Sequence, residues 1–593
     1  MVKATLTGIT LTLAVSTVLV AQGRLVDDIA LRKAGTGDDW LTYGLSQSEA
    51  RFSRLAQINT RTVDRLVPVW TAELGSGGGG QEATPLVLNG TLYVITNWSV
   101  VIAIDARTGF ERWRTDPQVD QLDVRPEICC GIVNRGLATY KGLIIAPVID
   151  GRLRALDAET GALVWESRVA FPHDHYTITM APRIAKGLVI VGVSGSDRPT
   201  RGFFDAYDAV TGRRKWRFYT VPGDPSKPFE NEALKRAAST WDNEWWTRGG
   251  GGAVWDGMAY DPDLGLVYVG TGNAMPWTFR LRSSLGKDNL YVASILAVDV
   301  GTGALKWHYQ VVPGDNWDFD SVQHLILADL RIGGRLRKVV MQANKNGFYY
   351  VLDRVDGRFI SAAPFSQVNW ARGINPSTGR PIVNEEAYYG TDAILLSPGA
   401  GGAHNWSPMS FNPTTGLVYI PTSSASSFSY AAEAFYNPQP GRTTGIVLPA
   451  PVPRRPSPPA IGPVPVDGPP GRGALVAWDP IRQRMRWRMP GGGSIGGGTL
   501  STAGNLVFQS LSNGRLVAYS ADSGEKLLEL DTGLRSGMGP PITYRLDGRQ
   551  FVAVLGGVGE FFTSPGNPNA PPTPKLITFA LAERYAVPRA ATR

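Results

Sequence analysis

Short runs of apolar, β-forming residues recur along most of the chain and indicate its fold class. Thr91–Ile95, Gly187–Gly192 and Gly265–Gly270 are three such runs, and turn-forming residues lie close to each of them. Apolar positions at helical spacing are scarce by comparison. The pattern therefore predicts an all-β protein built from many short strands.

A motif of constant form follows several of these runs. It reads small, hydrophobic, Asp, x, x, Thr, Gly, with a Trp four residues after the Gly. Successive early copies are 52 and 51 residues apart, which is the period of a propeller blade. Complete copies contain Asp105, Asp157, Asp208 and Asp299, and degenerate copies contain Asp353, Asn412, Asp479 and Ser520.

The motif has the chemistry of a hairpin between the last two strands of a blade. Its Asp can accept hydrogen bonds from the turn, and its Gly can take a positive φ. Its Trp is large enough to pack between neighbouring blades. We therefore predict an eight-bladed β-propeller with tryptophan-docking repeats, closed by pairing the strand near Trp70 with the C-terminal segment.

Three segments interrupt this rhythm, at 225–248, 369–397 and 423–473. The first contains a helix-prone stretch at 230–238. The third is rich in Pro, Ser and Gly, and we predict that it is a long surface loop. Long loops on one face of a propeller commonly build its binding site, and we expect these segments to do so.

The N-terminus has the pattern of an export signal. Lys3 precedes an uncharged apolar stretch, and a small-x-small sequence ends at Gly23. A membrane anchor is the alternative, but the stretch is short and is diluted by Thr and Ser. We predict a signal peptide over 1–23, a single propeller domain over 24–593, and no membrane span in the mature chain.

Charge and cysteine content narrow the function classes. The chain has 59 Lys and Arg against 51 Asp and Glu, and the two signs are interspersed. No basic run resembles a nucleic-acid-binding patch. The only cysteines, Cys129 and Cys130, are adjacent. They can be two buried thiols or, in an oxidising compartment, a disulfide that closes a strained ring.

Eight segments carry a more specific signal: Gly80–Glu82, Cys129–Gly136, Trp216–Gly223, Gly249–Trp255, Gly270–Asn273, Trp317–Asp320, Lys345–Gly347 and His404–Trp406. Together, and in this order, they resemble the pyrroloquinoline-quinone (PQQ)-dependent alcohol dehydrogenases, the quinoprotein family that includes the large subunits of methanol dehydrogenase. The resemblance extends from Asp38 to about Ala582. The eight-bladed fold of that family agrees with the repeat period.

The resemblance implies PQQ as cofactor, a flat, acidic ortho-quinone that lies between a Cys129–Cys130 disulfide and the Trp255 ring. Trp255 could instead be a blade wedge, but it lies outside the repeated motif. His404 adjoins a cofactor contact, and we expect it to be structural. The remaining implied contacts to PQQ are Glu82, Arg135, Thr179, Ser194, Gly195, Lys345, Asn405 and Trp406.

The resemblance also implies one metal ion beside the reactive carbonyl, with Asp197, Asn273, Asp318 and Asp320 as ligands. Asp318 would also be the catalytic base. Asp320 resembles the lanthanide-using branch, and an added carboxylate favours a trivalent cation, so we expect a lanthanide rather than Ca²⁺. Asp197 stands where the family usually has Glu, which makes it the least secure ligand.

The function implied is oxidation of an alcohol to an aldehyde or ketone in the periplasm. Many members have a Trp over the cofactor mouth where this chain has Ser494-Ile495-Gly496, which favours a bulkier or secondary alcohol over methanol. Because the chain lacks C-x-x-C-H, the expected electron acceptor is a separate soluble cytochrome c. An aldose or polymeric alcohol as substrate, and a non-catalytic scaffold of the cell envelope, are the alternatives.

Overall fold

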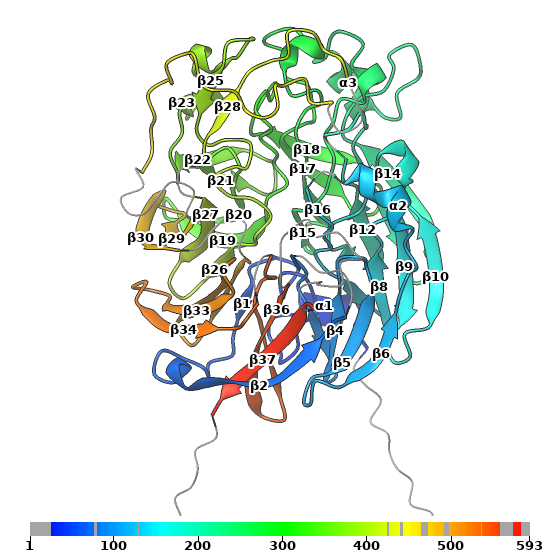
Figure 1. Ribbon diagram of the computed structural model, residues 1–593, viewed down its shortest axis with the longest axis vertical. Coiled ribbons are helices and arrows are strands. Elements are labelled where there is room, and N and C mark those ends of the chain that lie inside the picture. The colour runs from blue at the N-terminus through cyan, green and yellow to red at the C-terminus, as the bar shows by residue number, and fades with distance from the viewer. Residues whose placement is uncertain are drawn as a thin grey trace, which may run out of the picture.

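Four-stranded antiparallel sheets succeed one another around a central axis in the computed structural model (Figure 1). The structure describes residues 25–75, 80–128, 130–195, 197–423, 426–438, 443–463, 473–491, 497–534, 537–557 and 573–582. Over this part of the chain, seven four-stranded sheets and one five-stranded sheet form the blades, so the prediction of an eight-bladed β-propeller is confirmed. The predicted signal peptide, 1–23, lies outside the described residues.

Blades 1 to 4 each use four consecutive strands. Blade 1 contains β3 Leu86–Leu88, β4 Thr91–Ile95, β5 Val101–Asp105 and β6 Glu111–Thr115, and blade 2 contains β7 Ala138–Tyr140, β8 Leu143–Pro147, β9 Arg152–Asp157 and β10 Leu163–Arg168. Blade 3 contains β11 Arg183–Ala185, β12 Leu188–Gly192, β13 Phe203–Asp208 and β14 Arg214–Tyr219. Blade 4 contains β15 Met258–Asp261, β16 Leu266–Gly270, β17 Ser294–Asp299 and β18 Leu305–Gln310.

Blades 5 to 8 complete the ring. Blade 5 contains β19 Ile326–Ile332, β20 Arg335–Ala343, β21 Phe348–Asp353 and β22 Phe359–Pro364, and blade 6 contains β26 Ser410–Asn412, β27 Leu417–Ser423, β29 Gly473–Asp479 and β30 Arg484–Pro490. Blade 7 contains β31 Thr499–Thr502, β32 Leu506–Ser510, β33 Arg515–Ser520 and β34 Lys526–Asp531, and the short strand β1 Phe52–Ser53 pairs with β31. Blade 8 contains β35 Ile542–Leu546, β36 Arg549–Gly556 and β37 Lys575–Leu581 from the C-terminal part of the chain and β2 Leu66–Glu73 from the N-terminal part.

Helices are short and lie in the connections. They are α1 Asp28–Arg32, α2 Gln121–Val124 and α3 Glu232–Ala238, with single 3₁₀ turns at η1 Val63–Arg65, η2 Arg125–Glu127, η3 Pro172–Asp174, η4 Trp245–Arg248, η5 Phe279–Leu281 and η6 Glu385–Ala387. The position of α3 confirms the helix-prone stretch. Among the described residues, no helix is long and apolar enough to cross a membrane.

The ring closes as predicted, between the two ends of the chain. Strand β2 pairs antiparallel with β37, and Trp70 lies opposite Thr578 in that register. The Trp70 indole N–H also donates to the Ala106 carbonyl of blade 1, 3.3 Å away. Because closure leaves each sheet next to another sheet, it protects the blade edges.

The repeated motif joins the third and fourth strands of a blade, as predicted. In blade 1, the Asp105 carboxylate accepts hydrogen bonds from the backbone N–H groups of Arg107 and Thr108, at 2.9 and 3.1 Å. Gly109 completes the turn with φ +79°, a conformation that glycine adopts without strain. Local chemistry therefore fixes this hairpin.

The motif tryptophan of one blade docks on the motif turn of the next. The Trp113 indole N–H donates to the Ala158 carbonyl at 3.1 Å, and its ring lies against Gly161. Trp165 makes the same bond to the carbonyl of Ala209. Each indole therefore fixes the position of one blade relative to its neighbour, which confirms the predicted docking role.

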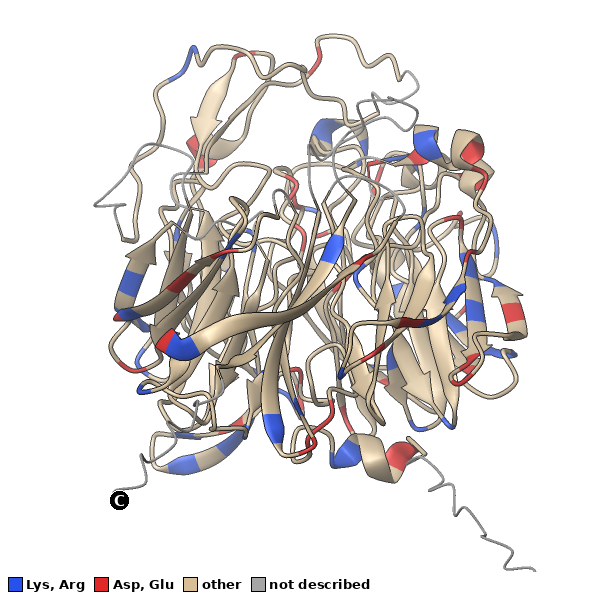
Figure 2. Ribbon diagram, turned by 60° about the horizontal axis from the view of Figure 1, so that its bottom comes forward, with Lys and Arg blue, Asp and Glu red and all other residues tan. Residues whose placement is uncertain are grey.

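The core runs through the inner three strands of the blades. All five residues of β4 are buried, whereas the outer strand β6 is mostly exposed. Lys and Arg positions are interspersed with Asp and Glu positions along the ribbon in Figure 2. The long connections gather on one face of the propeller, at the top of Figure 2, as expected.

Part of the segment 423–473 forms a small sheet with an earlier segment. Its strand β28, Phe428–Tyr430, pairs with β25, Ile394–Leu396, and Tyr430 is fully buried. A second small sheet joins β23, Ala371–Ile374, to β24, Pro381–Val383. Two of the segments that interrupt the rhythm therefore pair with each other through β25 and β28, and the surface loop over 423–473 stays a prediction.

The docking contact can be tested at Gly161. A Cβ atom there would lie 2.5 Å from the Trp113 ring, and the residue has φ +74°. Gly161→Ala should therefore cost about 2–4 kcal/mol, from backbone strain plus overpacking. Gly416, in a degenerate motif, has φ +69° but nothing within 4 Å of its Cβ position, so Gly416→Ala should cost only about 1–2 kcal/mol.

Thermal unfolding of both variants, followed by circular dichroism, separates the two effects. The midpoint of Gly161→Ala should fall clearly below that of Gly416→Ala. Equal midpoints would mean that the close contact between Gly161 and the Trp113 ring adds nothing to the cost of placing Ala at a positive φ.

Candidate active site

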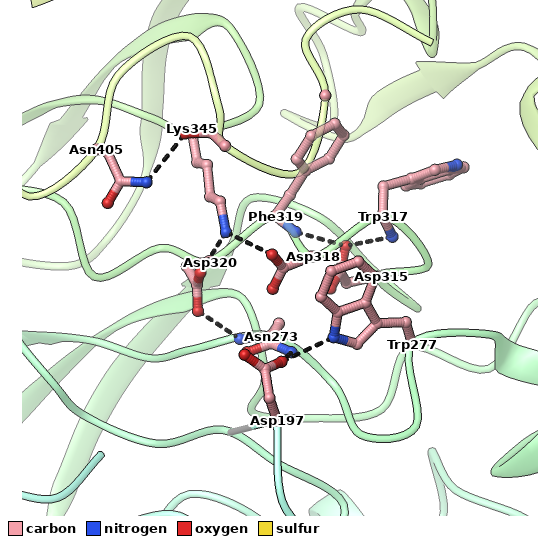
Figure 3. Close-up of polar contacts among 12 residues, drawn as sticks. Asp197, Asn273, Trp277, Asp315, Trp317, Asp318, Phe319, Asp320, Lys345 and Asn405 are labelled. Carbon is pink, nitrogen blue, oxygen red and sulfur yellow. Dashed lines mark hydrogen bonds and ion pairs between the residues drawn. The ribbon is translucent and has the colours of Figure 1, made fainter. Parts of the chain in front are cut away.

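Polar side chains from three neighbouring blades meet at one site (Figure 3). Asp197 follows β12, and Asn273 follows β16. Asp318 and Asp320 lie between β18 and β19, and Lys345 follows β20. Since blade docking fixes these strand ends, residues 148 positions apart in the chain reach a common site.

The Lys345 ammonium group lies between two carboxylates. Its Nζ is 2.9 Å from Asp318 Oδ2 and 2.7 Å from Asp320 Oδ2, and all three residues are buried. Burial alone would lower the pKa of Lys345, but the two carboxylates outweigh it and raise that pKa above its usual value. The lysine therefore stays charged, and it fixes the spacing of the two aspartates.

Asn273 connects Asp320 to Asp197. Its backbone N–H donates to Asp320 Oδ1 at 2.9 Å, and its side-chain amide donates to Asp197 Oδ1 at 3.2 Å. The Trp277 indole N–H donates to the same Asp197 oxygen at 2.8 Å. Asp197 therefore reaches the site despite being shorter than the usual Glu.

The carboxylates of this site carry more negative charge than Lys345 balances. Burial raises the pKa of Asp318 well above its usual range, against the opposing charge of Lys345. Burial also raises the pKa of Asp197, against the hydrogen bond from Trp277. Oxygen donors with uncompensated negative charge fit a hard cation, which would relieve that cost.

The four predicted metal ligands share one neighbourhood but do not converge on one point. Lys345 binds a carboxylate oxygen of Asp320, and Asn273 binds a carboxylate oxygen of Asp197. In the described part of the chain, no three acidic, His or Cys side chains are grouped closely enough to hold an ion. The donor set fits a metal in its chemistry, and the ligand assignment stays a prediction.

A second buried charge centre surrounds Arg135. Its guanidinium is 2.8 Å from Glu82 Oε2 and 3.8 Å from Asp256 Oδ2. It also donates to Thr179 Oγ1 at 2.9 Å, and Thr179 is 2.7 Å from the Ser194 hydroxyl. The structure therefore brings four of the predicted cofactor contacts into one hydrogen-bonded group.

Two tryptophans border this second centre. The Arg135 guanidinium lies 5.0 Å from the Trp255 ring centroid and 5.8 Å from the Trp406 ring centroid, within cation–π range. The Trp255 indole N–H donates to Asp320 Oδ1 at 3.3 Å. Trp255 therefore contacts both charge centres, and it lies outside the blade-docking positions.

The other predicted contacts are less closely joined. Asn405 lies beside Lys345 in Figure 3 and donates to the Gly401 carbonyl at 2.9 Å. Gly195 has φ +135°, and its carbonyl accepts a hydrogen bond from Thr200 at 2.6 Å. Cys130 is exposed, and Cys129 lies outside the described residues, so the Cys129–Cys130 disulfide stays a prediction.

His404 makes the contacts of a structural histidine. Its Nδ1 is 2.7 Å from the Pro421 carbonyl oxygen, and burial lowers the pKa of the imidazole to about 4. Near neutral pH the buried imidazole is therefore neutral, and it serves as a packed, hydrogen-bonded core residue. The stretch Ser494-Ile495-Gly496, predicted to open the entrance, lies outside the described residues.

Sequence reasoning missed three buried participants. Trp277 orients Asp197, Asp256 pairs with Arg135, and Asp315 accepts backbone hydrogen bonds beside Asp318. Trp277 gave a usable signal, because, like Trp255, it stands outside the repeated motif. The two aspartates gave none, since their partners come from distant residues or from the backbone.

Known proteins are similar to this chain over most of its length. Residues 40–370 match the family described as the PQQ glucose/ethanol/alcohol dehydrogenase β-propeller domain. The chain is 44% identical over 592 residues to the quinohemoprotein alcohol dehydrogenase ADH IIB of Pseudomonas putida, covering 98% of this chain and 83% of that protein.

Two solved structures share the fold over nearly the whole chain. The quinohemoprotein alcohol dehydrogenase of Comamonas testosteroni superposes with a TM-score of 0.85 at 43% identity, covering 96% of this chain and 84% of that one. A europium-containing methanol dehydrogenase superposes with a TM-score of 0.80 at 31% identity, covering 93% of this chain and 99% of that one.

Proposed function

The chain belongs to the family of PQQ-dependent alcohol dehydrogenases, and we propose that it oxidises a bulkier or secondary alcohol to an aldehyde or ketone with Asp318 as the base. It is an oxidoreductase whose family implies PQQ and a metal ion as cofactors. The observation that carries the proposal for the site is the buried group of Asp318, Asp320 and Lys345.

When bound, PQQ supplies an ortho-quinone that accepts a hydride, and a metal ion supplies a Lewis acid beside it. The chain contributes the proton acceptor. A carboxylate oxygen of Asp318 takes the hydroxyl proton of the alcohol as the carbinol C–H bond breaks. Lys345 orients Asp318 and opposes the effect of burial on its charged form, because its ammonium group lies 2.9 Å from that carboxylate.

The residues around Arg135 would bind and orient the cofactor. Arg135, Thr179 and Ser194 form a row of donors suited to carboxylates. Trp255 offers a flat aromatic surface next to that row, and its indole N–H is 3.3 Å from Asp320. A planar, acidic ring over Trp255 would thus lie within reach of both charge centres.

The electron acceptor and the compartment follow from the same assignment. The predicted signal peptide over 1–23 supports a periplasmic enzyme. The relatives are quinohemoprotein alcohol dehydrogenases, which supports electron transfer to a cytochrome. We propose a soluble cytochrome c as that acceptor.

The base is tested by Asp318→Asn. The amide keeps the size of the side chain but accepts a proton poorly, so kcat should fall about 10²- to 10⁴-fold. The measurement is alcohol-dependent dye reduction by protein reconstituted with PQQ and metal. Quinone absorbance after gel filtration should match the wild type, which controls for cofactor binding. A kcat within about threefold of wild type would remove Asp318 from the role of base.

The metal preference is tested by reconstitution. Protein stripped with EDTA and reloaded with PQQ should reduce dye faster with La³⁺ than with Ca²⁺, because Asp197, Asp318 and Asp320 favour the higher charge. Similarity to a europium-containing methanol dehydrogenase supports the same order. In Asp320→Ala, which removes one carboxylate, the ratio of the two rates should move towards Ca²⁺. An unchanged ratio would exclude Asp320 from metal selection.

The substrate class is tested with a panel of methanol, longer n-alcohols, secondary and cyclic alcohols and aldoses. We expect kcat/KM to be higher for the longer and secondary alcohols than for methanol, since Ile495 stands where many members have a Trp over the cofactor. A clear preference for methanol would contradict this, and a preference for aldoses would support the alternative substrate.

A further inference from the structure

Asp315 lies three residues before Asp318 and is fully buried. One of its carboxylate oxygens, Oδ1, accepts hydrogen bonds from the backbone N–H groups of Trp317 and Phe319, both at 3.1 Å (Figure 3). These residues are the two chain neighbours of Asp318. A single oxygen therefore holds the backbone on both sides of the proposed base.

Asp318 needs such support because its own backbone is in an unfavourable conformation. Its φ is +63°, in the left-handed region that non-glycine residues rarely adopt. A residue stays there only when the surrounding structure holds it, and such residues cluster at functional sites. The two hydrogen bonds to Asp315 supply that restraint directly at the strained residue.

Arg282 fixes the position of Asp315 in turn. Its guanidinium is fully buried and donates to the backbone carbonyls of Pro276, Trp277 and Asp315. Its Nε also donates to Asn289 Oδ1 at 3.1 Å. Arg282 thereby ties the loop of Asp318 to the loop that carries Trp277, the donor to Asp197.

We infer that Asp315 is a positioning residue for the proton transfer, which holds Asp318 in its left-handed conformation so that the Asp318 carboxylate meets Lys345 and the alcohol. The inference rests on the proposed role of Asp318. Asp315 itself contacts neither Asp318's carboxylate nor Lys345 in the hydrogen bonds of the described residues. Its effect on catalysis is therefore transmitted through the backbone.

The hydrogen bonds require an oxygen acceptor and not a charge. Asp315→Asn keeps an oxygen at the Oδ1 position and should preserve both bonds to Trp317 and Phe319. Asp315→Ala removes them and frees Asp318 to leave its positive φ. Since a displacement of about 1 Å in a catalytic group can cost about 10²-fold in rate, the two variants should differ widely.

The experiment compares Asp315→Asn and Asp315→Ala with a matched control, Asp205→Ala. Asp205 is also fully buried and also paired, with Arg217 at 2.7 Å, but it lies on β13 away from the site. Asp315→Ala should lose about 10²-fold in kcat with KM changed less than about threefold. Asp315→Asn should stay within about threefold of wild type, and Asp205→Ala should lower the unfolding midpoint without lowering kcat of the folded enzyme.

Hydrogen–deuterium exchange of the cofactor-free protein gives a second readout that needs no turnover. In the peptide covering 315–320, the amides of Trp317 and Phe319 should be protected in wild type and in Asp315→Asn, and should exchange rapidly in Asp315→Ala. Exchange elsewhere should be unchanged in Asp315→Ala, except at Ala274, whose backbone N–H donates to Asp315 Oδ2 at 3.5 Å.

Two results would overturn the inference. One is an Asp315→Ala enzyme with wild-type kcat and protected amides at 317 and 319. The other is an Asp315→Asn enzyme as inactive as Asp315→Ala, because that would assign the effect to charge. If the wild-type protein oxidises no alcohol at all, the proposed function fails, and the exchange data alone decide whether Asp315 holds this loop.

Discussion

The balance of buried charge around Lys345 is the constraint on which the site depends. One ammonium group lies within 3 Å of the carboxylates of both Asp318 and Asp320, and Asp197 lies beyond Asn273. Burying carboxylates costs free energy unless donors or cations compensate them. Backbone and indole N–H groups compensate part of this charge. The remaining excess makes the site suited to a metal ion.

Such an arrangement needs a scaffold that keeps separate blades in register. No single blade could supply the site, since Asp197, Asn273 and Lys345 follow strands of three different sheets. The docking of each motif tryptophan on the next turn, as Trp113 docks on Gly161, fixes adjacent blades to each other. The closing pair β2 and β37 completes the ring, so a displacement of one blade would have to strain its neighbours.

The blades were predictable because their signals are local. Asp105 and Gly109 lie four residues apart and form one hairpin, so a short motif carries the information. The site was predictable only through resemblance to a family, because the partners of Lys345 lie 25 and 27 residues away and pair across a loop and a strand. Strand β28 was missed because its partner β25 lies in another irregular segment. Asp315 was missed because it accepts hydrogen bonds from backbone N–H groups, and every non-proline residue has such a group, so no residue type in the sequence marks the contact.

The two buried charge centres differ in what can balance them, and Trp255 stands between them. Around Arg135, burial raises the pKa of Glu82 to about 7 and that of Asp256 to about 6, despite the opposing charge of Arg135. A proton can therefore neutralise this centre near neutral pH. Around Lys345, the carboxylates face one another across a fixed ammonium group, and a metal ion is the matching partner. Under the proposed function, Arg135 would bind acidic groups of a planar cofactor on Trp255, and the carboxylates around Lys345 would hold a metal ion. Trp255, with its ring 5.0 Å from the Arg135 guanidinium and its N–H on Asp320, therefore joins the two centres.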